Sequence, residues 1–248
     1  MVQLLYGILI SVAAGLATGL GAIPILLFKK IPDKLHDALL GFAAGIMLTA
    51  ASLSLLLPAL EEGGLIQTII GIIVAGGFIF WIERKIPHLH PHFGKKPPDE
   101  IGLEKGLLMA VAVTLHNFPE GLAVGVGLAS GSEKLGVMLA VAIAAQNVPE
   151  GLAVAAPIAH SGVSKWKIFG LTLLSGLAEP IAAVVGMTVA GFSEMVLPFG
   201  LAFAAGAMIY VVSDQLIPEC HSGGNETEAT FGVMAGVIAM IILQKLMG

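Results

Sequence analysis

Long apolar stretches separated by short polar connections run along the whole chain of 248 residues. Most are close to the roughly 20 apolar residues that an α-helix needs to cross a bilayer. The pattern therefore predicts an all-α integral membrane protein with eight transmembrane helices, forming a single transmembrane domain over residues 1–248. The predicted spans are Val2–Phe28, Leu39–Leu60, Leu65–Ile82, Gly106–Ala129, Leu135–Ile158, Trp166–Ala190, Met195–Ile217 and Ala229–Met247.

The composition agrees with a membrane protein and excludes a soluble enzyme. Hydrophobic residues make up 56% of the chain, charged residues only 12%, and the mean hydropathy is +0.94. Soluble domains are typically about 25% charged, so this chain has too little polar material to cover a folded domain in water. The single cysteine, Cys220, excludes a metal site made of several thiolates. Nothing in the sequence indicates a nucleic-acid partner.

Basic residues predict the orientation of the spans. Ten of the twelve Lys and Arg residues fall in the connections after the first, third and fifth spans, whereas Lys134 and Lys245 fall on the other side. Cytoplasmic connections of membrane proteins carry an excess of Lys and Arg. We therefore expect a multi-pass protein of the cell membrane (plasma or inner membrane) with both termini outside the cytoplasm and a cytoplasmic, His-bearing loop over residues 83–105.

Two sequence repeats predict internal symmetry. The segment His116-Asn-Phe-Pro-Glu-Gly-Leu-Ala-Val124 recurs as Gln146-Asn-Val-Pro-Glu-Gly-Leu-Ala-Val154, and Phe42-Ala-Ala-Gly-Ile-Met47 matches Phe203-Ala-Ala-Gly-Ala-Met208. In each case the two copies lie on spans that run in opposite directions. This predicts inverted repeats in a 3+2+3 plan, with spans one to three related to six to eight and span four to five. Secondary transporters use such repeats for alternating access.

Glycines spaced four residues apart predict close contacts between helices. Exposed small-residue faces suggest a homodimer, although no motif assigns one. The glycine pairs are Gly15 with Gly19, Gly41 with Gly45, and Gly121 with Gly125.

Four carboxylates lie inside the predicted spans: Glu120, Glu150, Glu179 and Asp214. A charge at the centre of a bilayer costs at least about 2.5–3.5 kcal/mol on insertion scales, so such residues need partners. The spans contain no Lys or Arg at this depth. We therefore expect the missing positive charge to be an exogenous cation.

Helix geometry groups further polar residues with two of these glutamates. His116 and Glu120, four residues apart, share one face of a helix, and the second motif repeats the spacing with Gln146 and Glu150. An asparagine precedes each glutamate by three residues, and a proline in each motif frees a backbone carbonyl. Histidine with carboxylates and no thiolate suits Zn²⁺, and also Fe²⁺, Mn²⁺, Co²⁺ or Cd²⁺. The asparagines are Asn117 and Asn147.

The doubled motif resembles the fourth and fifth spans of the ZIP family of zinc and iron transporters, near its GufA-like bacterial members. The similarity extends to Glu179, to residues 45–48 and 207–210 and to Asp214, and it covers essentially the whole chain. It implies an eight-span transporter domain with inverted repeats that moves divalent metal into the cytoplasm. Zn²⁺ or a similar ion would be the bound substrate, and no catalytic cofactor is implied.

The resemblance also implies a set of ligands. One metal site would use His116, Glu120, Gln146, Glu150 and Met47, and a neighbouring site would share both glutamates. The second site would add Asn117, Asn147 and Glu179. Many relatives carry Asp where this chain has Asn147, so the number of bound ions stays open between one and two. The alternatives are that the asparagines join helices by hydrogen bonds and that Met47 is an ordinary core residue.

Other polar residues suggest a route to the cytoplasm. Asp214 would guard the exit or relay protons, and Glu219 with His221 would form a further stop on the way. The loop histidines His88, His90 and His92 suggest transient metal capture, with a solvated flexible linker as the alternative.

The rival prediction is an intramembrane zinc-dependent hydrolase, in which a held metal would activate water. Such a protease needs a second nearby histidine, as in His-Glu-x-x-His, and the sequence has none. We therefore expect a transporter and not an enzyme.

Overall fold

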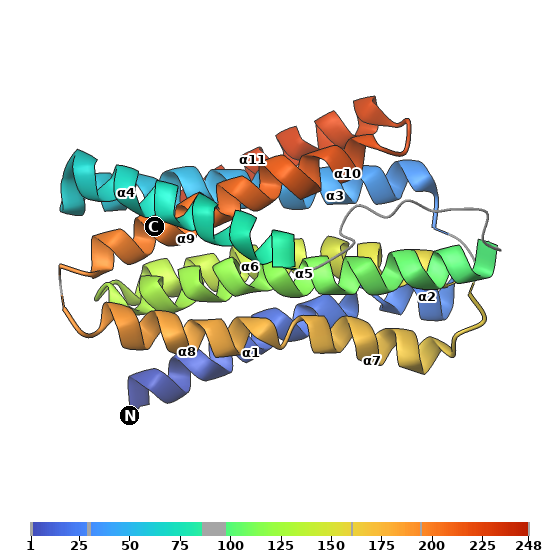
Figure 1. The fold of residues 1–248 in the computed structure, drawn as a ribbon, viewed down its shortest axis with the longest axis horizontal. Helices are drawn as coiled ribbons and strands as arrows, with labels where there is room; N and C mark the ends of the chain where they lie inside the picture. The colour runs from blue at the N-terminus through green and yellow to red at the C-terminus, as the bar shows by residue number, and fades with distance from the viewer. Residues whose placement is uncertain (1, 29–30, 86–97, 160, 194, 248) are drawn as a thin grey trace.

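The computed structural model describes residues 2–28, 31–85, 98–159, 161–193 and 195–247, and every regular element in these ranges is helical. Figure 1 shows the helices side by side in an elongated bundle. They are α1 (Val2–Leu20), α2 (Ile23–Leu27), α3 (Asp33–Thr49), η1 (Ala50–Leu56), α4 (Leu57–Lys85), α5 (Pro98–Ala129), α6 (Glu133–Ile158), α7 (Lys165–Ser175), α8 (Ala178–Ala190), α9 (Leu197–Val211), η2 (Val212–Leu216), α10 (Ile217–His221) and α11 (Glu226–Met247).

The described residues contain seven helical segments that are long and apolar enough to cross a membrane. One of these, Asp33–Lys85, has 53 residues and would measure about 80 Å if straight, against about 30 Å for the hydrocarbon core. It is not straight, because Gly64 adopts φ 70° and ψ 175° within α4. This left-handed φ, which suits glycine, interrupts the helix between the second and third predicted spans.

The α5–α6 pair lies at the centre of the bundle. In Figure 1 it separates α1, α2, α7 and α8 from α3, α4 and α9–α11. On one side α5 packs against α8 and α6 packs against α1; on the other side α5 packs against α9 and α6 against α3. Both copies of the repeated motif are therefore enclosed by neighbouring helices.

Proline breaks the sixth predicted span into α7 and α8. Pro180 has no N–H to donate to the carbonyl of Gly176, which instead accepts from Glu179 N at 3.3 Å. The break places Glu179 in the first turn of α8, close to the middle of the span. Pro24 accompanies a similar break between α1 and α2.

Two wide helical turns, η1 and η2, occur in the second and seventh predicted spans. Each ends two residues before a proline, Pro58 or Pro218. The residue before each proline donates its N–H five residues back, from Leu57 to Ser52 O and from Ile217 to Val212 O. Turns of this π type widen a helix locally and re-aim the side chains that it carries.

The predicted close contacts at glycines are confirmed. A Cβ added to Gly15, Gly45 or Gly125 would collide with a backbone carbonyl oxygen of a neighbouring helix. The partners are Gly176, Val233 of α11 and Ala183 of α8, respectively. Glycine at these positions therefore lets the helix backbones touch.

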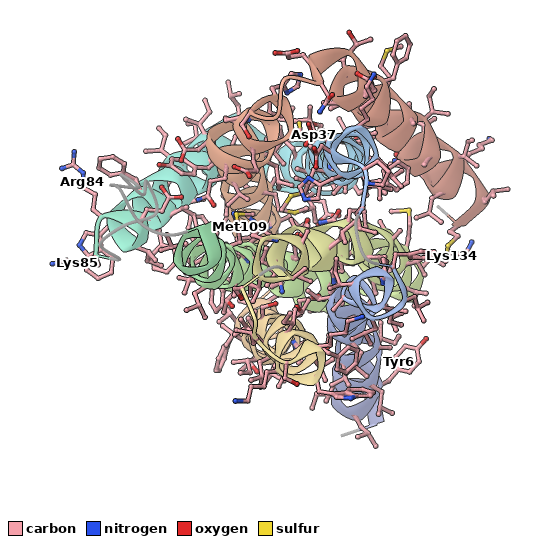
Figure 2. All side chains as sticks on the ribbon, turned by 90° about the vertical axis from the view of Figure 1, so that its right-hand side faces the viewer. Tyr6, Asp37, Arg84, Lys85, Met109 and Lys134 are labelled. Carbon is pink, nitrogen blue, oxygen red and sulfur yellow. The ribbon has the colours of Figure 1, made fainter. Side chains whose placement is uncertain are left out.

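The beginnings of α3, α5 and α7 and the connection from α10 to α11 lie at one end of the bundle, on the right in Figure 1, and Lys34, Lys165 and Lys167 belong to the first turns of α3 and α7. Figure 2 looks along the bundle from this end; Arg84 and Lys85 project outward from α4, and Asp37 lies among the helices. Lys34 pairs with Glu228 at 2.6 Å across α3 and α11. The start of α1 and the end of α11 both lie toward the opposite end of the bundle.

Candidate metal site

Seven of the predicted ligands are polar side chains buried together at the centre of the bundle. Each is at most 4% exposed to solvent. They come from α5, α6 and the first turn of α8. Helix α5 packs against both α6 and α8, and a hydrogen bond joins α6 to α8. The seven residues are His116, Asn117, Glu120, Gln146, Asn147, Glu150 and Glu179.

Amide side chains of α6 connect the glutamates of the other two helices. Gln146 Nε2 donates to Glu120 Oε1 of α5 at 2.5 Å. Asn147 Nδ2 donates to Glu179 Oε1 of α8 at 2.6 Å and to the carbonyl of Ala14 in α1 at 2.9 Å. The site is therefore assembled across helices that lie far apart in the sequence.

The asparagine of the first motif makes the matching contact on the other side. Asn117 Nδ2 donates to the carbonyl of Ser175 at 2.8 Å, at the end of α7 where the helix is broken. Both asparagines thus join helices by hydrogen bonds, as the alternative interpretation expected. Their side-chain oxygens nevertheless remain buried without a hydrogen-bond partner among the described residues, so both oxygens are available to a cation.

The site has an excess of buried acceptors. Both carboxylate oxygens of Glu150, and one each of Glu120 and Glu179, are buried without a hydrogen-bond partner in the described part of the chain. The three carboxylates lie within electrostatic range of one another. Counting only His, Cys, Asp and Glu, no three described side chains stand close enough to hold a metal ion. Enclosing a cation here therefore needs amide oxygens or a small approach of the helices.

Three residues that the sequence interpretation did not select extend the site from His116. His116 Nε2 hydrogen-bonds Gln215 Oε1 of η2, and Gln215 Nε2 donates to Glu83 Oε1 near the end of α4. Tyr210 of α9 donates its O–H to Glu83 Oε2 at 2.9 Å. The sequence offered only a weak sign of these residues: Gln215 follows Asp214, and Glu83 directly follows the third predicted span.

Met47 is fully buried in the main apolar core, on α3, which packs against α6. No described contact joins it to the polar cluster, so its role as a ligand stays a prediction. Asp214 is exposed on η2, next to Gln215. The loop histidines His88, His90 and His92 lie outside the described residues.

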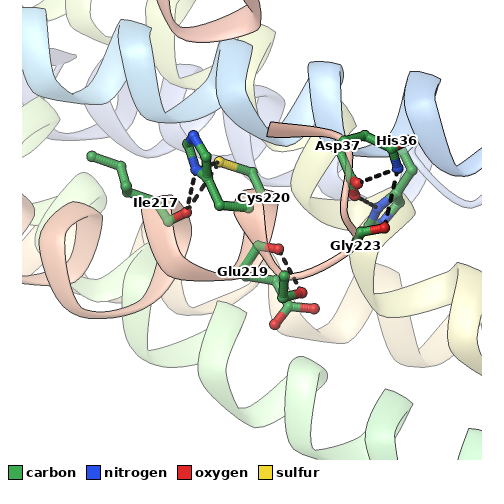
Figure 3. Close-up of polar contacts among 9 residues, drawn as sticks. His36, Asp37, Ile217, Glu219, Cys220 and Gly223 are labelled. Carbon is green, nitrogen blue, oxygen red and sulfur yellow. Dashed lines mark hydrogen bonds and ion pairs between the residues drawn. The ribbon is translucent and has the colours of Figure 1, made fainter. Parts of the chain in front are cut away.

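The predicted stop formed by Glu219 and His221 lies on α10, at the end of the bundle that carries the basic residues. His221 Nδ1 donates to the carbonyl of Ile217 at 2.8 Å and is 3.3 Å from Cys220 Sγ (Figure 3). No described contact joins the two predicted side chains to each other. Asp37 of α3 lies against Gly223, just after α10, and accepts from Asn225 at 2.8 Å (Figure 3).

The fold and the site together define a multi-pass membrane protein that buries several carboxylates and a histidine among its central helices. Residues 91–244 match the family model described as ZIP Zinc transporter. The chain belongs to this family, which places it among membrane transporters and not among enzymes. The hydrolase alternative therefore has no support.

Several named relatives match nearly the full chain. Zinc transporter GufA of Myxococcus xanthus is 39% identical over 98% of this chain and 99% of its own. Zinc transporter ZIPB of Bordetella bronchiseptica is 39% identical over 98% of this chain and 82% of its own. Zinc transporter ZupT of Chlorobaculum parvum is 37% identical over 97% of both chains.

Proposed function

We propose that this protein carries a divalent metal cation, Zn²⁺ foremost, across the cell membrane into the cytoplasm by alternating access. The observation that carries the proposal is the set of buried, unpartnered carboxylate oxygens on Glu120, Glu150 and Glu179. Buried charges are otherwise paired or bound to metals, because leaving them alone is costly. The names of the relatives support zinc, and the donor set also suits Fe²⁺, Mn²⁺, Co²⁺ and Cd²⁺.

The same donors favour a single bound ion. His116, Glu120, Gln146 and Glu150 would supply one nitrogen and several oxygens, which suits a borderline divalent cation. Beside them, the neutral Asn147 amide already donates to Glu179. That contact stabilises the carboxylate without a second cation, so we propose one ion bound mainly by the first four residues.

We further propose eight transmembrane helices related by inverted 3+2+3 repeats. The Gly64 interruption supports counting the 53-residue segment as two spans. Helix contacts occur in matching pairs under this symmetry: α1–α6 with α8–α5, α3–α11 with α9–α4, and α3–α6 with α9–α5. The paired turns η1 and η2 fall in related spans as well.

The first turns of α3 and α7, which carry Lys34, Lys165 and Lys167, lie at the same end of the bundle, and this supports placing that end in the cytoplasm, with both termini outside. Asp214, Glu219 and the loop over 83–105 would then lie on the route by which metal leaves. A homodimer remains a prediction, which the mass of the protein in nanodiscs would test.

Uptake of radioactive zinc into proteoliposomes tests the function. We expect Glu120→Ala and Glu150→Ala to abolish saturable uptake, while Glu62→Ala, which removes an exposed carboxylate, leaves it unchanged. Competition by iron, manganese, cobalt and cadmium at equal concentration would rank the substrates. Wild-type rates in both site variants would refute the proposal.

A further inference from the structure

Two hydrogen bonds connect Glu83 to Gln215 and Gln215 to His116, and the chemistry of these groups determines which atom donates in each. A carboxylate has no N–H or O–H to give and can only accept. Glu83 accepts at both oxygens, from Tyr210 O–H at 2.9 Å and from Gln215 Nε2. The NH₂ group of Gln215 must therefore face Glu83, because its carbonyl oxygen would meet the carboxylate as a second acceptor.

This orientation determines which atom of Gln215 faces the histidine. With its NH₂ group turned to Glu83, Gln215 presents Oε1 to His116 Nε2. An amide oxygen accepts and does not donate, so Nε2 must carry the hydrogen. In a neutral imidazole the other ring nitrogen then has no proton and keeps its lone pair.

That other nitrogen is in a position to bind. His116 Nδ1 is buried and has no hydrogen-bond partner among the described residues, and His116 lies one helical turn before Glu120 on the same face of α5. We propose that Glu83 and Gln215 hold His116 in the Nε2–H tautomer, so that Nδ1 is the atom that binds the transported cation. This inference rests on the proposed function, in which His116 is a ligand.

The members of this hydrogen-bonded series come from three helical segments, because Tyr210 and Gln215 share the segment Leu197–His221. Gln215 belongs to the wide turn η2, Glu83 lies near the end of α4, and Tyr210 of α9 anchors the second carboxylate oxygen. Glu83 and Gln215 are positioning residues, since they act on the cation only through the imidazole. In metal sites, hydrogen-bond partners of this kind fix ring orientation and raise ligand basicity, and their removal typically costs about 10–100-fold in metal affinity.

Nitrogen NMR of ¹⁵N-histidine-labelled protein in nanodiscs tests the inference. The ring signals of His116 are assigned as those missing from His116→Asn. Without metal we expect a protonated Nε2 and an unprotonated Nδ1. With ¹¹³Cd²⁺ as the probe, we expect coupling between cadmium and Nδ1. Coupling to Nε2 would overturn the inference and leave the metal site standing, whereas no coupling to His116 would refute its role as a ligand.

Two substitutions separate positioning from packing. Gln215→Leu removes the acceptor, so we expect a mixture of tautomers and zinc binding weakened about 10–100-fold. Gln215→Glu keeps an oxygen toward the ring, so the Nε2–H tautomer should persist even though the bond to Glu83 is lost. Ser213→Ala, an exposed change in the same turn, should leave the His116 spectrum unchanged. A single Nε2–H tautomer in Gln215→Leu would overturn the proposed role of Gln215.

Discussion

Replacing Glu150 with glutamine should raise the stability of the metal-free protein and reduce its response to zinc. The Glu150 carboxylate is 1% exposed, and neither oxygen has a hydrogen-bond partner among the described residues. It also lies within electrostatic range of Glu120 and Glu179. Glutamine has nearly the same shape, carries no charge, and brings two donors to a site that is rich in acceptors.

The expected gain follows from the missing partners. A buried polar group without a partner costs about 1–3 kcal/mol, and Glu150→Gln should recover an amount of this size without metal. For a protein of 150–250 residues, 1 kcal/mol corresponds to about 2–4 °C in melting temperature, so we expect a rise of about 2–12 °C.

Zinc should show the opposite trend. At a zinc concentration 100 times the dissociation constant, binding stabilises the wild type by about 2.7 kcal/mol. If losing this ligand weakens binding 100-fold, the same zinc concentration stabilises the variant by only about 0.4 kcal/mol. The variant should therefore melt higher than the wild type without metal and gain much less when zinc is added.

Melting of the purified protein in detergent, with chelator and with zinc, measures both effects. Asp37→Asn is the matched control, because Asp37 is also a buried carboxylate but accepts from Asn225 at 2.8 Å and lies 3.3 Å from His36 Nδ1. It should lose stability in both conditions and keep the full zinc increment. A Glu150→Gln protein that melts lower without metal and keeps the wild-type zinc increment would show that Glu150 is a structural residue.

Four other changes test the packing, an exposed ion pair and the turns. Gly125→Leu should destabilise the protein by about 1–3 kcal/mol through overpacking, whereas Gly170→Ala, which faces open space in a helix, should stabilise it by about 0.5–1 kcal/mol in thermal melts. Lys34→Ala breaks the exposed pair with Glu228 and should leave the melting temperature unchanged. Deleting Ser213 should restore α-helical bonding in η2 and abolish zinc uptake with folding retained in gel filtration; wild-type uptake would show that the wide turn is dispensable.

Most of the fold could be predicted from the sequence, because the length of each apolar segment can be found without knowing which other segments it contacts. Seven apolar segments fall where spans were expected, and the second and third predicted spans lie in a single segment interrupted at Gly64. The breaks and wide turns were not predicted. Pro24 and Pro180 break the helix, whereas helices α5 and α6 continue through Pro119 and Pro149. All four prolines lie inside apolar spans, so the local sequence pattern does not distinguish these two outcomes.

The residues of the site likewise include some that the sequence predicted and some that it did not. His116 and Glu120 were found because a helix places residues four apart on one face, and the repeat drew attention to the second pair. Gln215 and Glu83 were missed because their significance depends on a contact between spans three, four and seven. A glutamine beside an exposed aspartate carries no charge signal of its own, so only the folded chain shows what it contacts.

Comparing the two halves of the bundle shows where the proposed internal symmetry would fail. Asn117 donates to the carbonyl of Ser175, four residues before Glu179, and Asn147 donates to the carbonyl of Ala14, four residues before Thr18. Thr18 thus occupies the position in α1 that Glu179 occupies in the sixth predicted span. Its hydroxyl is buried and has no partner among the described residues, since Ala14 O, its usual acceptor in a helix, already accepts from Asn147. A neutral side chain here leaves three buried carboxylates instead of four. That lower charge favours one divalent cation over two, because a second cation would lack the carboxylate that exact symmetry would have supplied.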